Sequence, residues 1–484
     1  MSLRDEQALV NGFLEGKVTR RQFIQRAAAA GLSLSSIGAV LAACGGGGDT
    51  AVQPPAATGP TTVPGAPTEP PPPTPVVADI GKGDTQIKFW HGLGGADGAT
   101  MATMLKRYSD EKKVGVRSET YAWDVFYQKL PTSIVGRTPP DMAVMHADRV
   151  PQFKAKGLVQ RADALFFDPG LVPKDDFSKD VLAAVTVDGE IQAVPFDQHG
   201  WGMYVNTELL KKAGYDYQKM PKNGDEFIDW ATKLTTDKNG KHPDEDGFNP
   251  NQVQVWGTHV IAGTLTLYST IWSFEGDLFD PKSKKAMLDS ENTVKAIQYT
   301  YDAIHKHRIA PAPTAELSAQ DLYAANRLAM MYDGTWALNF FKDRPPIEKK
   351  TKAVWVPSLS DGKQVAWYGS HLLVIPNQVS EDRKKPAVEL IKWLSDNSME
   401  WATSGQIPAR LSAQNDPRIN DIWSVAVFSK MFQEIGRTLP PHPALNELAA
   451  AWEPAFSAAL SKTTPVKEAL TNANKQMQAV LDRA

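Results

Sequence analysis

The sequence predicts an α/β fold from residue 85 onward, and three observations support this prediction. The chain has 484 residues, 42% of them hydrophobic and 13 of them tryptophan, which is enough to bury the cores of roughly two or three domain-sized units. Short β-rich runs alternate with amphipathic helical runs, as in a mostly parallel sheet covered by helices. The single cysteine, Cys44, excludes a disulfide framework, so the hydrophobic core must stabilise the fold.

The first 43 residues have the order of an export signal. The basic pair Arg20 and Arg21 precedes the apolar run "AAAAGLSLSSIGAVLAA" (residues 27–43), which ends in small residues. The pair resembles a twin-arginine signal, and "LAAC" (residues 41–44) resembles the lipobox of bacterial lipoproteins. We therefore predict export, cleavage before Cys44 and lipid on its thiol. A general secretory signal and a retained anchor are the alternatives, although the run is short for a membrane span of about 20 apolar residues.

Residues 44–83 are rich in glycine and proline and include "TEPPPPTPVV" (residues 68–77). Such a segment cannot bury apolar surface, and its prolines cannot donate backbone hydrogen bonds. We predict a semi-extended tether that holds the following domains away from a membrane surface. A pro-peptide or a glycosylated stalk is the alternative.

The elements after residue 84 follow in the order β-α-β-α-β. Strands are predicted at 85–92, 114–123 and 141–147, and amphipathic helices at 99–113 and 124–136. Ligands bind beyond the carboxyl ends of the strands in such sheets. We therefore expect binding residues in the loops that start at Trp90, Tyr121 and Met145.

A second α/β unit is predicted to begin after the turn at 187–197. It contains helical patterns at 225–236 and 292–307, β-rich runs at 327–336 and 352–377, and a helical tail from 386 to 482. The polar loop at 237–251 carries several acidic residues, but their spacing departs from that of a calcium-binding loop. We therefore expect a solvated loop there. The nine histidines show no HExxH motif, so a zinc hydrolase is not supported. No metal site and no cofactor are predicted.

Six segments, taken in order, resemble the sugar-binding group of the extracellular solute-binding proteins of ABC importers, the maltose-binding protein family. They are "IKFWHG", "GRTPPDMAVMHADRVPQFKAKGLVQRADAL", "DGEIQAVPFDQHGWGMYVNTELLKKAG", "LAMMYDGTWAL", the late helix "AVELIKWLSD" and the turn "IPARLSA". The resemblance implies a periplasmic-binding-protein-like fold, in which two α/β lobes joined by crossing segments enclose one ligand cleft. It places lobe I at 85–197 plus 371–413 and lobe II at 198–370 plus 414–484.

The resemblance also implies a set of ligand-binding residues. In lobe I these are Trp90 and His91 at the end of the first strand, and Asp148 and Arg149 after the third, where a surface ion pair is the alternative. Met145 stands where the family has a stacking tryptophan, which argues against maltose as the ligand. Arg410, in the "IPAR" turn, either forms a structural salt bridge or reaches the cleft.

The first crossing contributes His199, Trp201 and Tyr204, whose alternative role is packing. In the second lobe, Trp272 is either a cleft aromatic or a buried helix residue. Gly334 is expected to let the backbone approach the ligand while Trp336 stacks beneath it. Tyr368, Gly369 and His371 at the second crossing complete the set.

The predicted function is capture of a carbohydrate or similar polar solute outside the cell and its delivery to the permease subunits of an ABC importer. We predict a monomer that is not an enzyme and is anchored to the membrane through Cys44. The 52 basic and 55 acidic residues form no block typical of nucleic-acid binding. An exported α/β hydrolase and a cell-surface sensor with the same fold are the alternatives.

Overall fold

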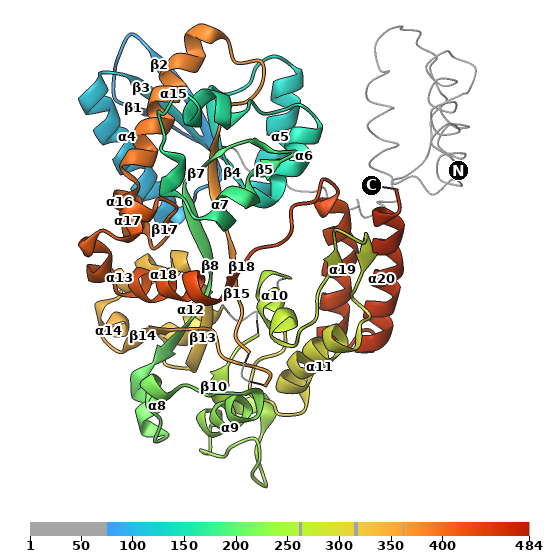
Figure 1. The fold of residues 1–484 in the computed structure, drawn as a ribbon. Coiled ribbons are helices and arrows are strands. Elements are labelled where there is room, and N and C mark those ends of the chain that lie inside the picture. Colours follow the sequence, from blue (N-terminus) through green and yellow to red (C-terminus); the bar gives the residue numbers. More distant parts are fainter. Residues whose placement is uncertain (1–74, 261–263, 314–317, 362, 484) are drawn as a thin grey trace, which may run out of the picture. The chain divides into compact units, whose positions relative to one another are not determined.

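The computed structural model describes residues 75–260, 264–313, 318–361 and 363–483 (Figure 1). Every described residue belongs to one compact unit, Pro71–Ala484. The predicted export signal, Cys44 and most of the predicted tether therefore lie outside the described residues. None of the described helices is both long enough and apolar enough to span a membrane.

The first sheet of the described chain has six strands, and we call the part built on it lobe I. Its strands, in spatial order, are β1 (Val76–Ile80), β3 (Gly115–Thr120), β2 (Gln86–His91), β4 (Met142–His146), β16 (His371–Val374) and β7 (Val194–Pro195). The β-α-β-α-β segment predicted from the sequence is present, because β2 pairs in parallel with both β3 and β4. Strands β1, β16 and β7 join this core antiparallel to their neighbours.

Helices cover the sheet of lobe I because their apolar residues recur at helical spacing. In α4 (Gly95–Lys112), for example, the buried side chains include Met101, Met104, Leu105 and Tyr108. Helix α4 packs against α15 (Glu381–Asp396), which follows β16. The other helices near this sheet are α5 (Trp123–Val135), α6 (Val150–Ala155), α7 (Lys179–Ala184) and α16 (Ser398–Trp401).

The predicted tether extends too far at its carboxyl end. Val76–Ile80 forms edge strand β1, which pairs antiparallel with β3 from Val76 opposite Thr120 to Ile80 opposite Val116. The side chains of Val76 and Val77 are 70% and 42% exposed, so backbone hydrogen bonds contribute more to this strand than burial does. The proline-rich composition just before it hid the signal, because the segment shows no alternation of apolar and polar residues.

Lobe II is built on an eight-stranded sheet. Its main path is β18 (Gly436–Arg437), β15 (Ala366–Gly369), β8 (Asp197–Asn206), β13 (Leu328–Gly334), β10 (Val253–Thr258) and β9 (Thr236–Asp237). Two further strands, β14 (Thr351–Val354) and β17 (Ile407–Pro408), also pair with β8. All ten residues of β8 are buried, as expected for a strand with partners on both edges and helices on both faces.

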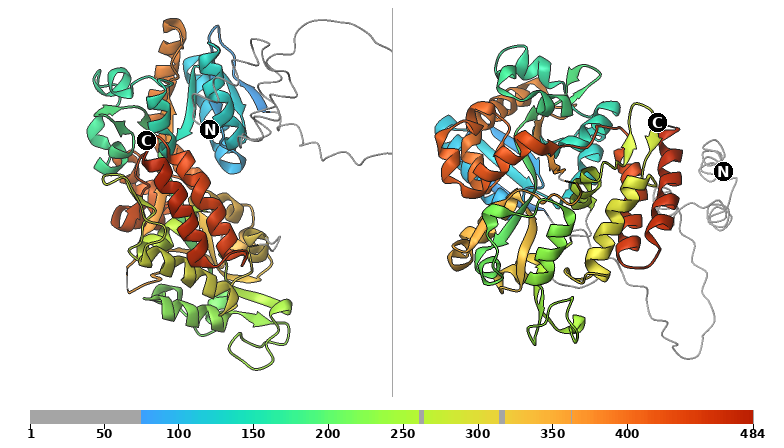
Figure 2. Two further views of the ribbon diagram at one scale, coloured as in Figure 1. Left: turned by 90° about the vertical axis from the view of Figure 1, so that its right-hand side faces the viewer. Right: turned by 60° about the horizontal axis from the view of Figure 1, so that its bottom comes forward.

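The helices of lobe II fall into two groups. Around the sheet lie α8 (Thr207–Lys212), α9 (Gly224–Leu234), α12 (Ala319–Ala324), α13 (Leu338–Lys342), α14 (Pro345–Glu348) and α18 (Trp423–Ile435). A second group has its own apolar core and consists of α10 (Thr264–Ser273), α11 (Glu291–His305), α19 (Leu445–Leu460) and α20 (Val466–Leu481). Helices α19 and α20 lie side by side in both figures and form the last part of the helical tail predicted at 386–482 (Figures 1 and 2).

Three neighbouring segments of the chain connect the two lobes. The chain passes from β7 into β8 at Phe196, whose backbone N–H donates to the carbonyl of His371, and it returns through Ser370, between β15 and β16. The third segment contains β17, which pairs with the first residues of β8, before α17 (Leu411–Gln414). The predicted class of two α/β lobes joined by crossing segments is confirmed.

Candidate ligand-binding site

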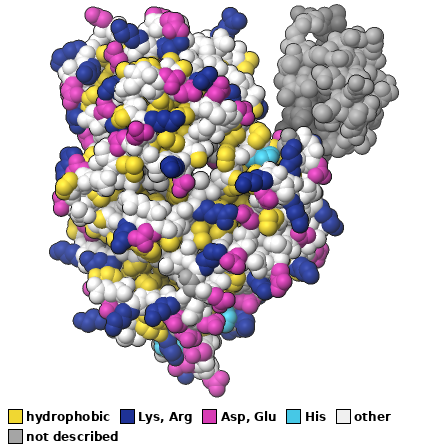
Figure 3. Space-filling model, in the orientation of Figure 1, with side chains coloured by type: hydrophobic (Ala, Val, Ile, Leu, Met, Phe, Trp, Pro, Cys, Tyr) yellow, Lys and Arg dark blue, Asp and Glu magenta, His cyan; other side chains and the backbone are white. Residues whose placement is uncertain are grey.

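A cavity of about 840 Å³ lies between the lobes, and both lobes and all three crossing segments contribute to its wall. On the face shown in Figure 3, apolar side chains gather in the hollow between the two parts of the molecule. This volume is near the upper end of the range of about 300 to 1,000 Å³ that is common for small-molecule sites. The cavity therefore has room for a ligand larger than a single sugar ring.

The lobe I wall is formed at the carboxyl ends of the three parallel strands. Gly94–Asp97 follows β2, Trp123 follows β3, and His146–Arg149 begins at the last residue of β4. These are the loops expected to carry the site, because parallel strands in α/β sheets present their binding loops at this end.

The lobe II wall is largely aromatic. The rings that line it belong to Tyr268, Trp336, Phe340, Trp367, Tyr368 and Trp452. Trp336 lies in a short 3₁₀ turn, Thr335–Ala337, and its half-buried indole packs edge-on against Trp201 with ring centroids 5.1 Å apart. A half-buried indole that is supported by a second ring and lines a cavity is suited to stacking against an apolar ligand face.

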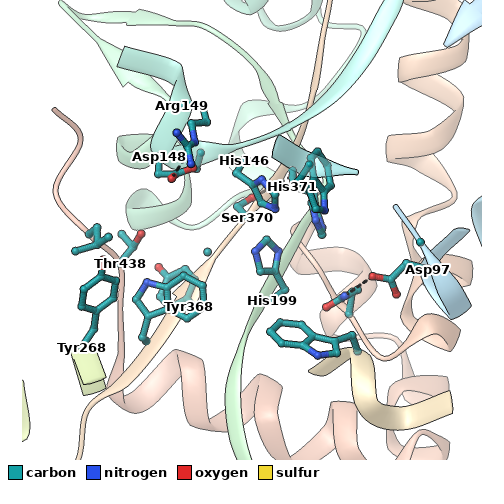
Figure 4. A pocket seen from close by; sticks show the side chains of 18 of the residues that line it. Asp97, His146, Asp148, Arg149, His199, Tyr268, Tyr368, Ser370, His371 and Thr438 are labelled. Atoms are coloured by element: carbon teal, nitrogen blue, oxygen red, sulfur yellow. Dashed lines mark hydrogen bonds and ion pairs between the residues drawn. The ribbon is translucent and has the colours of Figure 1, made fainter. Parts of the chain in front are cut away.

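Three histidines cluster where the crossing segments meet lobe I. Figure 4 shows the rings of His146, His199 and His371 turned toward one another, and one ring nitrogen of each lies within 4.8 Å of those of the other two. Register explains the cluster, because His371 is opposite His146 in the β16–β4 pair and His199 is opposite Gly369 in the β8–β15 pair.

The buried carboxylate of Asp197 holds two of these rings. It accepts from Nδ1 of His199 at 3.1 Å and from Nδ1 of His371 at 2.7 Å, and it also accepts from the indole N–H of Trp401 at 2.8 Å. Burial alone would raise the pKa of Asp197, but the charge of His371 and the hydrogen bonds from both rings hold it well below its usual value. An ionised carboxylate only accepts hydrogen bonds, so both Nδ1 atoms carry hydrogen.

Burial lowers the pKa of two of the three histidine rings, those of His146 and His371. It lowers the pKa of His146 well below its usual value, and the nearby His371 and His199 lower it further. Burial also lowers the pKa of His371, although the charge of Asp197 opposes this effect. Neutral imidazoles can accept a hydrogen bond or bind a metal through the free nitrogen.

Asp97 and Gln406 form a polar link across the cavity wall. The carboxamide of Gln406 accepts from the hydroxyl of Thr335 in lobe II and donates to Asp97 at 2.8 Å. The other carboxylate oxygen of Asp97 is buried without a protein partner. Burial raises the pKa of Asp97 to about 7, and the hydrogen bond from Gln406 only partly opposes this rise.

Seven of the predicted ligand-binding residues line the cavity. They are Asp148, Arg149, His199, Trp336, Tyr368, Gly369 and His371. Asp148 and Arg149 lie 3.3 Å apart at the nearest charged atoms, and one oxygen of Asp148 is buried without a partner. Burial raises the pKa of Asp148, while Arg149 opposes the rise. This pair therefore retains hydrogen-bonding capacity for a ligand.

The other seven do not line the cavity. In lobe I, the buried indole of Trp90 packs against Tyr121, and the ring of His91 bonds to the hydroxyl of Ser118 at 2.8 Å. Burial, with a smaller contribution from the nearby His371, lowers the pKa of His91 to about 4. Successive residues of β2 point to opposite faces of the sheet. Both side chains are buried on their own face, so neither reaches the cavity. Arg410 forms the structural salt bridge that was its alternative role, with Asp176.

Four predicted residues of lobe II also do not line the cavity: Trp201, Tyr204, Trp272 and Gly334. Trp201 lies behind Trp336, and Trp272 stacks behind Tyr268, with ring centroids 5.7 Å apart. Tyr204 is fully buried and donates to the carbonyl of Gly334 at 3.0 Å.

The glycine at 334 is required for a different reason than predicted. A Cβ atom there would come within 2.2 Å of the indole ring of Trp336. The absence of a side chain at 334 therefore makes room for the indole of Trp336.

Several lining residues were not predicted. Asp97, Trp123 and His146 lie in the expected loops, a few residues beyond the positions that the sequence singled out. The adjacent Met145 is fully buried in β4, so the side chain exposed at this strand end is that of His146. Trp367, Gln406 and Trp452 had no usable signal, because their helical or strand patterns are equally typical of core residues.

The polar loop at 237–251 satisfies its own buried carboxylate. Asp237 accepts from the backbone N–H groups of Asn239, Lys241 and Asn249 at 2.7 to 3.1 Å. These bonds account for both oxygens of Asp237 and hold the loop in its turn.

Two α/β lobes, three crossing segments and a cavity between the lobes define the class of two-lobed solute-binding proteins. The family model for "Bacterial extracellular solute-binding protein" matches residues 103–426, more than half of the chain. The chain therefore belongs to this family, and the resemblance inferred from the sequence is confirmed.

Individual relatives are distant in sequence. The chain is 23% identical to an arabinooligosaccharide-binding protein of Halalkalibacterium halodurans, over 71% of this chain and 76% of the relative. It is also 23% identical to a maltooligosaccharide ABC transporter solute-binding lipoprotein of Streptococcus pneumoniae, over 75% of this chain and 81% of the relative. Among solved structures, it is similar to an acarbose receptor of Streptomyces glaucescens, with a TM-score of 0.71, 21% identity, and coverage of 82% of this chain and 98% of that one.

Proposed function

We propose that this solute-binding protein captures a carbohydrate of oligosaccharide size and delivers it to the permease subunits of an ABC importer. The observation that carries the proposal is the half-buried indole of Trp336, which is backed by Trp201 and lines a cavity rich in polar side chains. A sugar ring presents apolar C–H faces and polar hydroxyl edges. It needs an aromatic surface beneath it and hydrogen-bonding groups around it.

Both kinds of group come from both lobes. Trp123 belongs to lobe I and Trp336 to lobe II, while Asp148 and Arg149 lie across the cavity from Gln320 and Asn339. A ligand that touches both walls stabilises the arrangement in which they are close, as expected for proteins whose lobes close on their ligand. The size of the cavity and the names of the relatives that bind oligosaccharides support a substrate of several sugar units.

The proposal places the protein outside the cytoplasm, held at the membrane by lipid on Cys44. This part rests on the "LAAC" segment, on the family to which the chain belongs and on the relative that is named as a lipoprotein. A lipid anchor keeps a binding protein near the permease that it serves, because it confines diffusion to the membrane surface.

Isothermal titration calorimetry with arabino-, malto- and manno-oligosaccharides tests the proposal. We expect saturable binding of at least one of them. Trp336→Ala should weaken it by about 2 kcal/mol, or about thirtyfold, which is the effect of removing a central aromatic contact. Trp230→Ala is the matched control, because this half-buried tryptophan stacks on Tyr215 in lobe II and does not line the cavity.

Mass spectrometry of the bound sugar separates binding from hydrolysis. The proposal predicts that the sugar is recovered unchanged after long incubation. If the sugar is cleaved, or if Trp336→Ala and Trp230→Ala affect binding equally, the proposed function is wrong.

A further inference from the structure

The three-histidine cluster has the arrangement of a metal site. Its members come from β4, β8 and β16, which meet where the lobes join. Ring centroids are 4.2 Å apart for His199 and His371, 5.0 Å for His146 and His371, and 5.5 Å for His146 and His199. All three residues line the cavity, so an ion held between them would be reached from the cavity.

The groups around the cluster orient the rings as the neighbours of metal-bound histidines do. The carboxylate of Asp197 accepts from Nδ1 of both His199 and His371, which leaves Nε2 of each ring as the nitrogen with a free lone pair. It is itself fixed by the backbone N–H of His371 and by Trp401. Nδ1 of His146 lies 2.7 Å from the hydroxyl of Tyr127. A hydrogen bond to one nitrogen of each ring thus leaves the other nitrogen unused by any of the described residues.

The ligand set points to a particular class of cation. Three imidazole nitrogens without thiolates suit zinc and neighbouring divalent transition metals, whereas calcium and magnesium prefer oxygen ligands. Nitrogens bound to one tetrahedral zinc at about 2.0 to 2.1 Å would lie about 3.3 Å apart. The separations here are up to 4.8 Å, so binding requires the rings to approach one another by about 1 Å or more.

We propose that His146, His199 and His371 bind one divalent transition-metal ion of the zinc class at the junction of the two lobes. Three protein ligands leave a fourth coordination position, which faces the cavity. An oxygen of the bound solute can occupy this position, and this last step alone rests on the proposed carbohydrate-binding function. The alternative is that the same imidazoles accept hydrogen bonds directly from solute hydroxyls.

Zinc binding to the full chain, stripped with a chelator, tests the proposal in the absence of any sugar. Calorimetry should show one saturable high-affinity site, and metal analysis after dialysis should find one zinc per chain. His146→Asn and His371→Asn should each weaken zinc binding about tenfold or more, as loss of a ligand or its support does. His242→Asn is the control, since its ring bonds to the carbonyl of Thr235 in the polar loop, away from the cavity.

Cobalt provides a second measurement that does not depend on the stability of one variant. Cobalt-loaded wild-type protein should show the visible absorption of a nitrogen-ligated ion, and His146→Asn should lose it while retaining a native circular dichroism spectrum. The proposal is overturned if the wild type binds no zinc saturably, or if His146→Asn binds zinc and cobalt as the wild type does. Failure of all carbohydrates to bind would leave a positive zinc result intact, so the two proposals are tested separately.

Discussion

Replacing Asp97 with asparagine should stabilise the protein at pH 8 and have little effect near pH 4. Burial raises the pKa of this carboxyl from 3.8 to about 7, so above pH 7 the folded protein carries a poorly solvated charge that the unfolded chain solvates freely. Below pH 4 the group is neutral in both states and this cost is absent. The free energy of unfolding therefore falls as pH rises from the unfolded-state pKa of 3.8 to the folded-state pKa of about 7.

The magnitude follows from that pKa. At about 1.4 kcal/mol for each tenfold change in proton affinity, a rise from 3.8 to about 7 corresponds to about 4 kcal/mol. Asp97 is only half-buried beside a solvent-accessible cavity, so water reduces the cost, and we expect about 1 to 2 kcal/mol. Asparagine keeps the acceptor for the N–H of Gln406 and removes only the charge.

Urea unfolding of the wild type and Asp97→Asn at pH 4, 6 and 8 measures this difference. The free energy of unfolding of the variant should exceed that of the wild type by an amount that grows between pH 4 and pH 8. Asp289→Asn, at an exposed site, is the control for removing a carboxylate. A variant that is less stable at pH 8, or a difference that does not change with pH, would refute the reasoning.

Three further substitutions test other parts of the account. Gly202→Ala should cost about 1 to 3 kcal/mol in urea unfolding, because its Cβ would lie 2.1 Å from the ring of Phe428; Gly115→Ala, where the nearest atom is 3.5 Å away, should cost clearly less. Arg410→Ala should lower the free energy of unfolding by about 3 kcal/mol through loss of its salt bridge to Asp176. It should leave carbohydrate affinity unchanged, and a large loss of affinity would show that Arg410 contacts the ligand. Cys44→Ser should move the protein from the membrane fraction to the medium or periplasm in cell fractionation without altering affinity, and retention at the membrane would contradict lipid anchoring.

Local patterns were sufficient to predict the framework of the site. The alternation of strands and helices located β2, β3 and β4, and the loops after these strands form one wall of the cavity. The choice of residue within each loop was less successful. Trp90 and His91 were chosen because they end a strand, but they point to opposite faces of the sheet and each is buried there.

Long-range pairing explains most of what the sequence did not reveal. His146 and His371 are 225 positions apart and become neighbours only through the register of β4 with β16. No short motif can signal such a cluster, because the histidines are brought together by strand pairing and not by their spacing in the sequence. Likewise, the role of Gly334 depends on the rotamer of Trp336, which a sequence pattern does not specify.

A crystal structure of the protein with the oligosaccharide that binds most tightly tests the central claim most directly. The account predicts a sugar ring stacked on Trp336 in the cavity between the lobes, with further contacts to the Asp148–Arg149 loop. A sugar bound outside this cavity, or bound within it without contact to Trp336, would contradict the account.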